Sequence, residues 1–375
     1  MRGRILFNGN IVLESDFVKM ARDWLLSSLH EDRAVRESLK VLLITAGWLE
    51  NEFEEEPIKA ALRDIGIPSR FVGGFDGNLQ NLSAYHSYRA FLDREPALAA
   101  AWNARAELME ATRRLYLEKN SFYVAQLRQS LSQLKERQSD GTLARVMQDV
   151  TGAFSHPPAD FDGDRLMGYF LGGDIRDTLG RLIDNDDRMV ELLRDLDEHF
   201  VVGTGLHFNP TWRSLRQTLE ERILSANSIF LFGGNLAALH RCLHFFRLGE
   251  VLVEALRRGT SFYTVSAGSL IMCERIIVYN DFATGAEFNL YDRGFGLVRS
   301  LQLFPHCMDR IQTDDPDNLS YLAYRFQNRQ CVGLNKDSFL LLEDQLATSV
   351  GKRDGVYLFD PSGAKMRFDF MEQLA

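Results

Sequence analysis

Short apolar runs alternate with amphipathic stretches near both ends of this chain. Residues 40–47 (Lys-Val-Leu-Leu-Ile-Thr-Ala-Gly) form an apolar run that ends in small residues, which is typical of a buried parallel strand. Residues 54–65 have helical spacing, with acidic residues and a proline in the first turn, and residues 68–72 indicate a second strand. Because strands alternate with helices, the pattern predicts an α/β fold with a doubly wound, mostly parallel sheet and flanking helices.

The pattern changes in the middle of the chain. Residues 96–134, 141–150 and 174–200 are rich in Ala, Leu, Glu and Arg at helical spacing. We therefore expect a large, mainly α-helical insertion at residues 78–208, and a discontinuous core domain made of residues 1–77 and 209–375. Such an insertion is a candidate flap over the ligand crevice, a candidate surface for a homo-oligomer, or a module for a protein partner.

Residues 261–270 (Ser-Phe-Tyr-Thr-Val-Ser-Ala-Gly-Ser-Leu) form the most informative segment. They predict a buried strand that runs into a sharp turn carrying Ser266 and then into a helix. This arrangement exposes a serine hydroxyl at the carboxyl edge of a sheet, where the backbone N–H of the next residue, Ala267, points at a developing oxyanion. Ser266 is therefore the candidate nucleophile.

A serine hydroxyl is a weak nucleophile at neutral pH, so it needs a base and a carboxylate that orients the base. His306 follows the apolar stretch 297–304, which predicts a position on a loop at the end of a strand. Asp281 lies between Ser266 and His306 in the sequence and is the candidate carboxylate. The order Ser, Asp, His is one of several that such sites use, so the order alone decides nothing.

A second glycine site follows the apolar strand at residues 228–232. Gly233, Gly234 and Asn235 end that strand and precede a helix. Glycines there let the backbone approach a ligand closely, so Gly233 and Asn235 are candidate substrate contacts. The N–H of Gly234, beside that of Ala267, would give the paired donors of an oxyanion hole.

Taken together, these motifs resemble the serine peptidases that include peptidase E, an aspartyl dipeptidase, and cyanophycinase, which share a class I glutamine amidotransferase-like fold. The resemblance rests on Gly233-Gly234-Asn235, Ser266-Ala267-Gly268, Asn280-Asp281 and Pro305-His306, which stand in the family's order and at its approximate spacing. It implies a serine hydrolase that cleaves a peptide or isopeptide bond, in small aspartyl-containing peptides, by a Ser-His-Asp mechanism. It implies no metal or organic cofactor.

The chain departs from the family pattern at three positions. Thr264 stands where glycine is usual, and its β-branched side chain is expected to crowd the turn; Ser269 replaces an alanine, and Leu236 replaces a polar residue. These departures and the insertion keep a second hypothesis open, a non-catalytic binding or regulatory protein that retains the fold and engages a partner. An amidotransferase-like domain is a third hypothesis, against which the serine at position 266 counts, because such domains use cysteine.

Other patterns suggest metal sites but lack the necessary ligands. His240 and His244 are spaced for one helix face, but no glutamate follows His240 as in zinc peptidases, so helix packing is the simpler interpretation. Asp160, Asp162 and Asp164 imitate the start of a calcium loop, but Arg165 stands where the loop needs glycine.

Composition limits the remaining function classes. With 375 residues and 45% hydrophobic content, the chain can bury a sizeable core. A net charge of −9 argues against a general nucleic-acid binder. No stretch reaches the roughly eighteen apolar residues of a membrane helix. The first residues do not resemble a signal peptide, and the four cysteines lack the spacing of a metal site. We therefore expect a cytoplasmic protein that acts on small peptides, without nucleic-acid or membrane partners.

Overall fold

The structure is a computed structural model of the chain. It describes residues 3–10, 20–22, 29–68, 71–72, 75–279, 288–344, 346–351, 355–368 and 373–374.

A sheet of eight strands, in the order β16-β13-β12-β1-β7-β6-β2-β5, forms the centre of the molecule. Strands β1, β7, β6, β2 and β5 are parallel to one another, and β12, β13 and β16 continue the sheet in antiparallel pairing. This confirms the predicted mostly parallel sheet. The strands are β1 (Ile5–Asn8), β2 (Val41–Ile44), β5 (Leu79–Asn81), β6 (Ser228–Leu231), β7 (Ser261–Val265), β12 (Ser338–Glu343), β13 (Leu346–Gly351) and β16 (Gln373–Leu374).

Side chains of the parallel strands alternate between two apolar cores, one on each face of the sheet. In β1, for example, Ile5 and Phe7 enter one core and Leu6 enters the other. Because both faces are covered, the strands read as continuous apolar runs. Helices α4 (Ala84–Arg94), α8 (Pro210–Leu224), α9 (Leu236–Phe245) and α10 (Leu248–Arg258) contribute to the first core, and α3 (Glu56–Asp64) contributes to the second.

A second sheet of four strands, in the order β10-β11-β14-β15, lies beside the first. Its strands β10 and β11 are parallel, and β14 and β15 are antiparallel to their neighbours. Its elements and the adjoining ones are β8 (Arg275–Tyr279), β9 (Phe288–Arg293), β10 (Leu301–Pro305), α12 (Cys307–Arg310), α13 (Pro316–Arg325), β11 (Gln330–Leu334), β14 (Val356–Phe359) and β15 (Lys365–Phe368).

The strand predicted at residues 68–72 is not part of the large sheet. Among the described residues of this range, Phe71–Val72 is extended, as β3, and it pairs with β4 (Phe75–Asp76) in a small separate hairpin. The neighbour of β2 is instead β5, because the carboxylate of Asp76 accepts hydrogen bonds from the N–H groups of Asn78 and Leu79 and turns the chain into the sheet.

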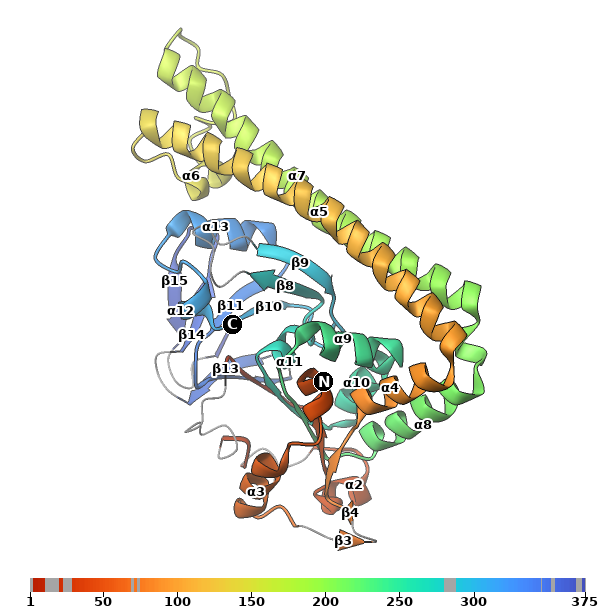
Figure 1. Cartoon of the computed structure of the whole chain (residues 1–375). Coiled ribbons are helices and arrows are strands. Elements are labelled where there is room, and N and C mark those ends of the chain that lie inside the picture. The colour runs from red at the N-terminus through yellow and green to blue at the C-terminus, as the bar shows by residue number, and fades with distance from the viewer. Residues whose placement is uncertain are drawn as a thin grey trace.

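Two helices of 42 residues, α5 (Pro96–Arg137) and α7 (Gly163–Thr204), form an antiparallel hairpin along one side of the body (Figure 1). At a rise of 1.5 Å per residue each is about 63 Å long. The short helix α6 (Leu143–Gln148) lies between them in sequence. These helices agree with the helical spacing of the sequence.

The hairpin is attached to the body by a buried ion pair. Arg325 of α13 and Asp186 of α7 are both fully buried, with Nε to Oδ2 and Nη2 to Oδ1 distances of 2.7 and 2.6 Å. Residues 79–94, which the sequence assigns to the insertion, form β5 and α4 of the sheet and its first core. The division of the chain into a core and an insertion stays a prediction, and we propose that the inserted part begins with α5.

Within the described residues, no helix is both long enough and apolar enough to span a membrane.

Candidate active site

Ser266 lies in a strained turn directly after β7. Its φ of 50° and ψ of −114° are unusual for a residue with a side chain. A single helical turn, α11 (Ala267–Leu270), follows. The helix expected after the turn is therefore short, but the strand-turn-helix order is as predicted.

Close backbone packing explains why small residues surround this turn. A Cβ on Gly268 would lie 2.3 Å from the carbonyl oxygen of Leu231 in β6. A Cβ on Gly233 would lie 3.0 Å from the Ala267 nitrogen and 3.1 Å from the Ser266 Cβ. Any larger residue at either position would push the two strand ends apart, so these glycines hold the β6 and β7 turns in contact.

The Gly-Gly-Asn turn also packs against the turn after β2. Gly234 has a φ of 113°, and a Cβ there would lie 2.7 Å from the Gly47 carbonyl oxygen. The N–H of Asn235 donates to that same oxygen at 2.8 Å. The side chain of Asn235 caps α9 by accepting from the Ala238 N–H at 2.9 Å, so its predicted contact with substrate stays a prediction.

His306 reaches Ser266 from the other sheet. It follows β10 directly, at the strand end predicted from the sequence, in a left-handed conformation with a φ of 58°. Its Nε2 lies 2.9 Å from the Ser266 Oγ, which is hydrogen-bonding distance for a nucleophile and its base. His306 is only 8% exposed, whereas Ser266 is partly exposed.

Asp281 lies outside the described residues. The chain leads toward it through β8, whose last residue is Tyr279. The Tyr279 hydroxyl donates to the carbonyl oxygen of Pro305, the residue before His306. The chain therefore leaves β8 beside the strand that carries the histidine.

The turns after β6 and β7 each carry a backbone N–H donor of interest, those of Gly234 and Ala267. Within the part of the chain that the structure describes, the N–H groups of Gly234 and Ala267 donate to no protein acceptor. The packing of Gly233 against Ala267 brings their two turns together. Their role as an oxyanion hole stays a prediction.

A hydroxyl pair beneath the turn was not predicted from the sequence. Thr264 and Ser269 are fully buried, and their Oγ atoms are 2.9 Å apart. Ser269 donates to the carbonyl oxygen of Asn8 at 3.3 Å, so its own oxygen accepts from Thr264. The same carbonyl accepts the N–H of Ser266 at 3.1 Å. Thr264 and Ser269, two of the departures from the family pattern, therefore form one hydrogen-bonded unit that supports the turn. Their occurrence together was the feature of the sequence that could have indicated this unit.

The residues that suggested metals have other partners. The His240 Nε2–H donates to the carbonyl oxygen of Arg293, and the His244 Nε2 lies 2.7 Å from Asp197 Oδ2. Asp162 caps α7 by accepting from two backbone N–H groups. These contacts are packing and capping roles.

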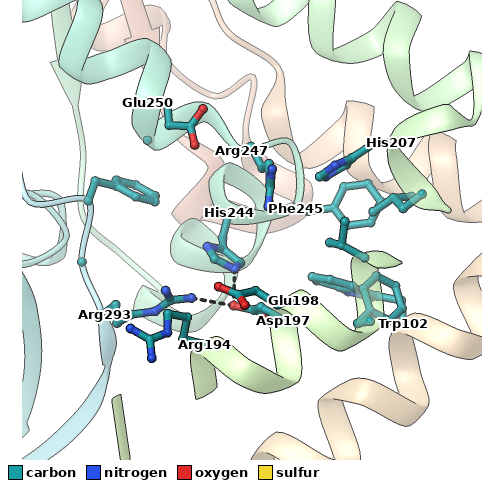
Figure 2. Close-up of a pocket in the computed structure, with 16 residues that line it drawn as sticks. Trp102, Arg194, Asp197, Glu198, His207, His244, Phe245, Arg247, Glu250 and Arg293 are labelled. Atoms are coloured by element: carbon teal, nitrogen blue, oxygen red, sulfur yellow. Dashed lines mark hydrogen bonds and ion pairs between the residues drawn. The ribbon is translucent and has the colours of Figure 1, made fainter. Parts of the chain in front are cut away.

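A cavity of about 300 Å³ lies elsewhere, between the base of the hairpin and helices α9 and α10 (Figure 2). Its lining includes neither Ser266 nor His306. On its floor, the Asp197 carboxylate accepts from His244 and Arg293 and from Arg105. Because α5, α7, α9 and β9 each supply one of these residues, the cluster acts as a joint between the hairpin and the body.

Comparison with known proteins finds a family similarity in the second half of the chain. Residues 188–350, which include both glycine turns, Ser266 and His306, match the model of peptidase family S51. Over these residues the chain is similar to peptidase family S51. The S51 match supports a serine peptidase in general. The chain matches no curated protein. Among solved structures it is similar to the crystal structure of a peptidase from an acI-B1 Actinobacterium, at 13% identity and a TM-score of 0.46, covering 100% of this chain and 97% of that one.

Proposed function

We propose that this S51-type chain is a serine hydrolase that cleaves a peptide or isopeptide bond with Ser266 as its nucleophile. The observation that carries the proposal is the 2.9 Å distance between Ser266 Oγ and His306 Nε2, with the serine held in a strained turn. A structural serine needs neither a histidine at hydrogen-bonding distance nor a backbone conformation that costs about 1 to 3 kcal/mol.

In the proposed reaction, Ser266 Oγ attacks the carbonyl carbon while His306 Nε2 takes the hydroxyl proton. The tetrahedral intermediate places its oxyanion at the N–H groups of Gly234 and Ala267. His306 then gives the proton to the leaving amine, and water releases the acyl group by the same steps. Loss of one oxyanion donor typically costs about 3 to 4 kcal/mol in the transition state.

Asp281 is the proposed carboxylate that orients His306. Its support is the resemblance in sequence and the course of β8 past Pro305. Asp281→Asn should cause a large but incomplete loss of turnover, because the amide still holds the ring but favours the wrong tautomer. Steady-state kinetics with any cleaved peptide measure this loss.

The proposed substrates are small peptides with an aspartyl residue beside the scissile bond, as the peptidase E and cyanophycinase resemblance implies. Aspartyl dipeptides, β-aspartyl isopeptides and matched alanyl dipeptides form a suitable panel. Preference for either aspartyl series over the alanyl peptides would support this specificity. Equal turnover of all three would refute the specificity but leave the serine hydrolase intact.

A fluorophosphonate probe tests the nucleophile itself. We expect the wild-type chain to be labelled and both Ser266→Ala and His306→Ala to lose labelling while keeping the wild-type circular dichroism spectrum. A serine and its base act as one unit, so the double variant should resemble either single variant. Ser132→Ala, at an exposed position on α5, serves as the serine control. If the wild type is not labelled under conditions that label a known S51 peptidase, the hypothesis of a non-catalytic binding protein is favoured over the serine hydrolase.

A further inference from the structure

The outward side of α5 carries a row of apolar side chains. Leu108, Leu115 and Phe122 are 57%, 63% and 64% exposed, although each is large and apolar. They recur every seven residues, so they share one face of the helix. Buried residues of α5 such as Tyr116 and Val124 lie on the opposite side, toward α7 and the body. The row is thus not explained by the packing of the chain on itself.

Residues between the large side chains complete a heptad pattern. We call the following set the α5 seam: Leu108, Ala111, Leu115, Glu118, Phe122 and Ala125. Successive members are three and four residues apart, which is the a and d spacing of a coiled coil. The a positions are large and the d positions are alanine, with Glu118 as the exception.

We propose that the α5 seam is the interface of a homodimer, in which α5 of a second copy packs antiparallel on α5 of the first. In an antiparallel pair the a positions of one helix meet the d positions of the other. Leu108 would then lie on Ala125 of the other copy, and Phe122 on Ala111. At these two contacts a large side chain meets an alanine, which allows the two helices to approach closely.

Charge selects the antiparallel arrangement. In this pairing Leu115 of one copy lies on Glu118 of the other. The Glu118 carboxylate then lies within reach of Arg114 of the first copy, the residue before Leu115. Arg114 and Glu118 are four residues apart on one helix, yet neither forms an ion pair in the described part of the chain. A parallel, in-register pair would instead bring two Glu118 side chains together, and like charges at an interface are unfavourable.

The position of the symmetry axis agrees with this pairing. In the proposed pairing, Leu115 lies on Glu118 of the other copy, so the two-fold axis passes between residues 116 and 117. The middle of α5 (Pro96–Arg137) is at the same point. The two helices therefore overlap over their whole length of about 63 Å. Figure 1 shows the hairpin along the outside of the body, with α5 labelled at the middle of its course.

Sedimentation or light scattering of the intact chain tests the dimer. We expect a mass twice that of the 42.8 kDa chain. Leu115→Glu should weaken dimerisation by about thirtyfold or more, as loss of a central apolar anchor does. Leu117→Glu is the matched control, since Leu117 is 38% exposed on the same helix but outside the seam. A wild-type chain that stays monomeric at its solubility limit would overturn the proposal, as would equal weakening by the two variants.

Charge exchange and cross-linking test the direction. Arg114→Glu should weaken the dimer, and the double variant Arg114→Glu, Glu118→Arg should restore it. A mixture of Leu108→Cys and Ala125→Cys chains should form a disulfide between the two variants under mild oxidation. The native cysteines do not interfere, because all four are buried. Cross-linking of Leu108→Cys chains to one another would show a parallel pair and contradict the arrangement.

Discussion

At the scale of residues, the turn that carries Ser266 depends on side chains below it as much as on those around it. Thr264, Ser269 and the Asn8 carbonyl form a chain of hydrogen bonds that ends at the Ser266 N–H. The sequence predicted that Thr264 crowds the turn, whereas its hydroxyl has a buried partner. Buried hydroxyls of this kind are costly to leave unpaired.

We predict that Thr264→Val and Ser269→Ala each lower the free energy of unfolding by about 1 to 3 kcal/mol, because each removes one partner of a buried pair. The double variant should lose about as much as one single variant, since the second change leaves no new group unpaired. Urea unfolding of the four proteins measures the coupling. Strictly additive losses would contradict the paired role.

At the scale of elements, α7 is fixed to α13 by a buried charge network. Besides Asp186, Arg325 donates from Nη1 to the carbonyl oxygen of Phe288 and to the hydroxyl of Tyr321, at 2.6 Å each. The Asp186 carboxylate beside it holds the pKa of Arg325 above its usual value, against the effect of burial. The guanidinium therefore stays charged, and its environment must supply the counter-charge.

Asp186→Asn should lower the free energy of unfolding by about 3 to 5 kcal/mol, because it leaves a buried guanidinium without its carboxylate. Arg188→Gln is the matched control on α7, since Arg188 pairs with Glu191 at the surface and such pairs contribute at most about 1 kcal/mol. Urea unfolding compares the two. Similar small losses would mean that the hairpin is held mainly by its apolar contacts.

At the scale of the whole molecule, two histidines of α9 lie at or beside the joint between hairpin and body, and burial favours their neutral forms. Burial lowers the pKa of His240 to about 4, although Asp292 nearby raises it. Burial also lowers the pKa of His244 to about 4, and Arg105, Arg293 and Arg247 act in the same direction. His240 is 5% exposed, so burial favours its neutral form.

The folded pKa of His240 lies below its unfolded value of about 6.5, so the unfolded chain takes up the proton first as pH falls. The stabilisation is complete above pH 6.5 and is lost between pH 6.5 and about 4, up to about 3 kcal/mol. Urea unfolding at pH 7, 6 and 5 measures this slope. His240→Gln keeps a donor for the Arg293 carbonyl and should flatten the slope, and an unchanged slope would assign it to other groups.

The sequence by itself determined the local features. Apolar runs ending in small residues defined β2, β6 and β7, since strands buried on both faces contain few polar residues. Helical spacing identified α5 and α7, because each helix buries one side. Glycines and Ser266 marked the turns because few other residues fit there.

Only the tertiary structure decided which distant segments meet. His306 belongs to a different sheet from Ser266, and no local pattern reports the 2.9 Å between them. The edge strand β5 was missed because three residues carry too little periodicity to predict a strand. No sequence pattern indicates that Arg325 is buried, and only the fold supplies the Asp186 carboxylate that lets this charged side chain be buried. Long-range pairing of this kind depends on how the elements pack, which the order of residues along one element does not contain.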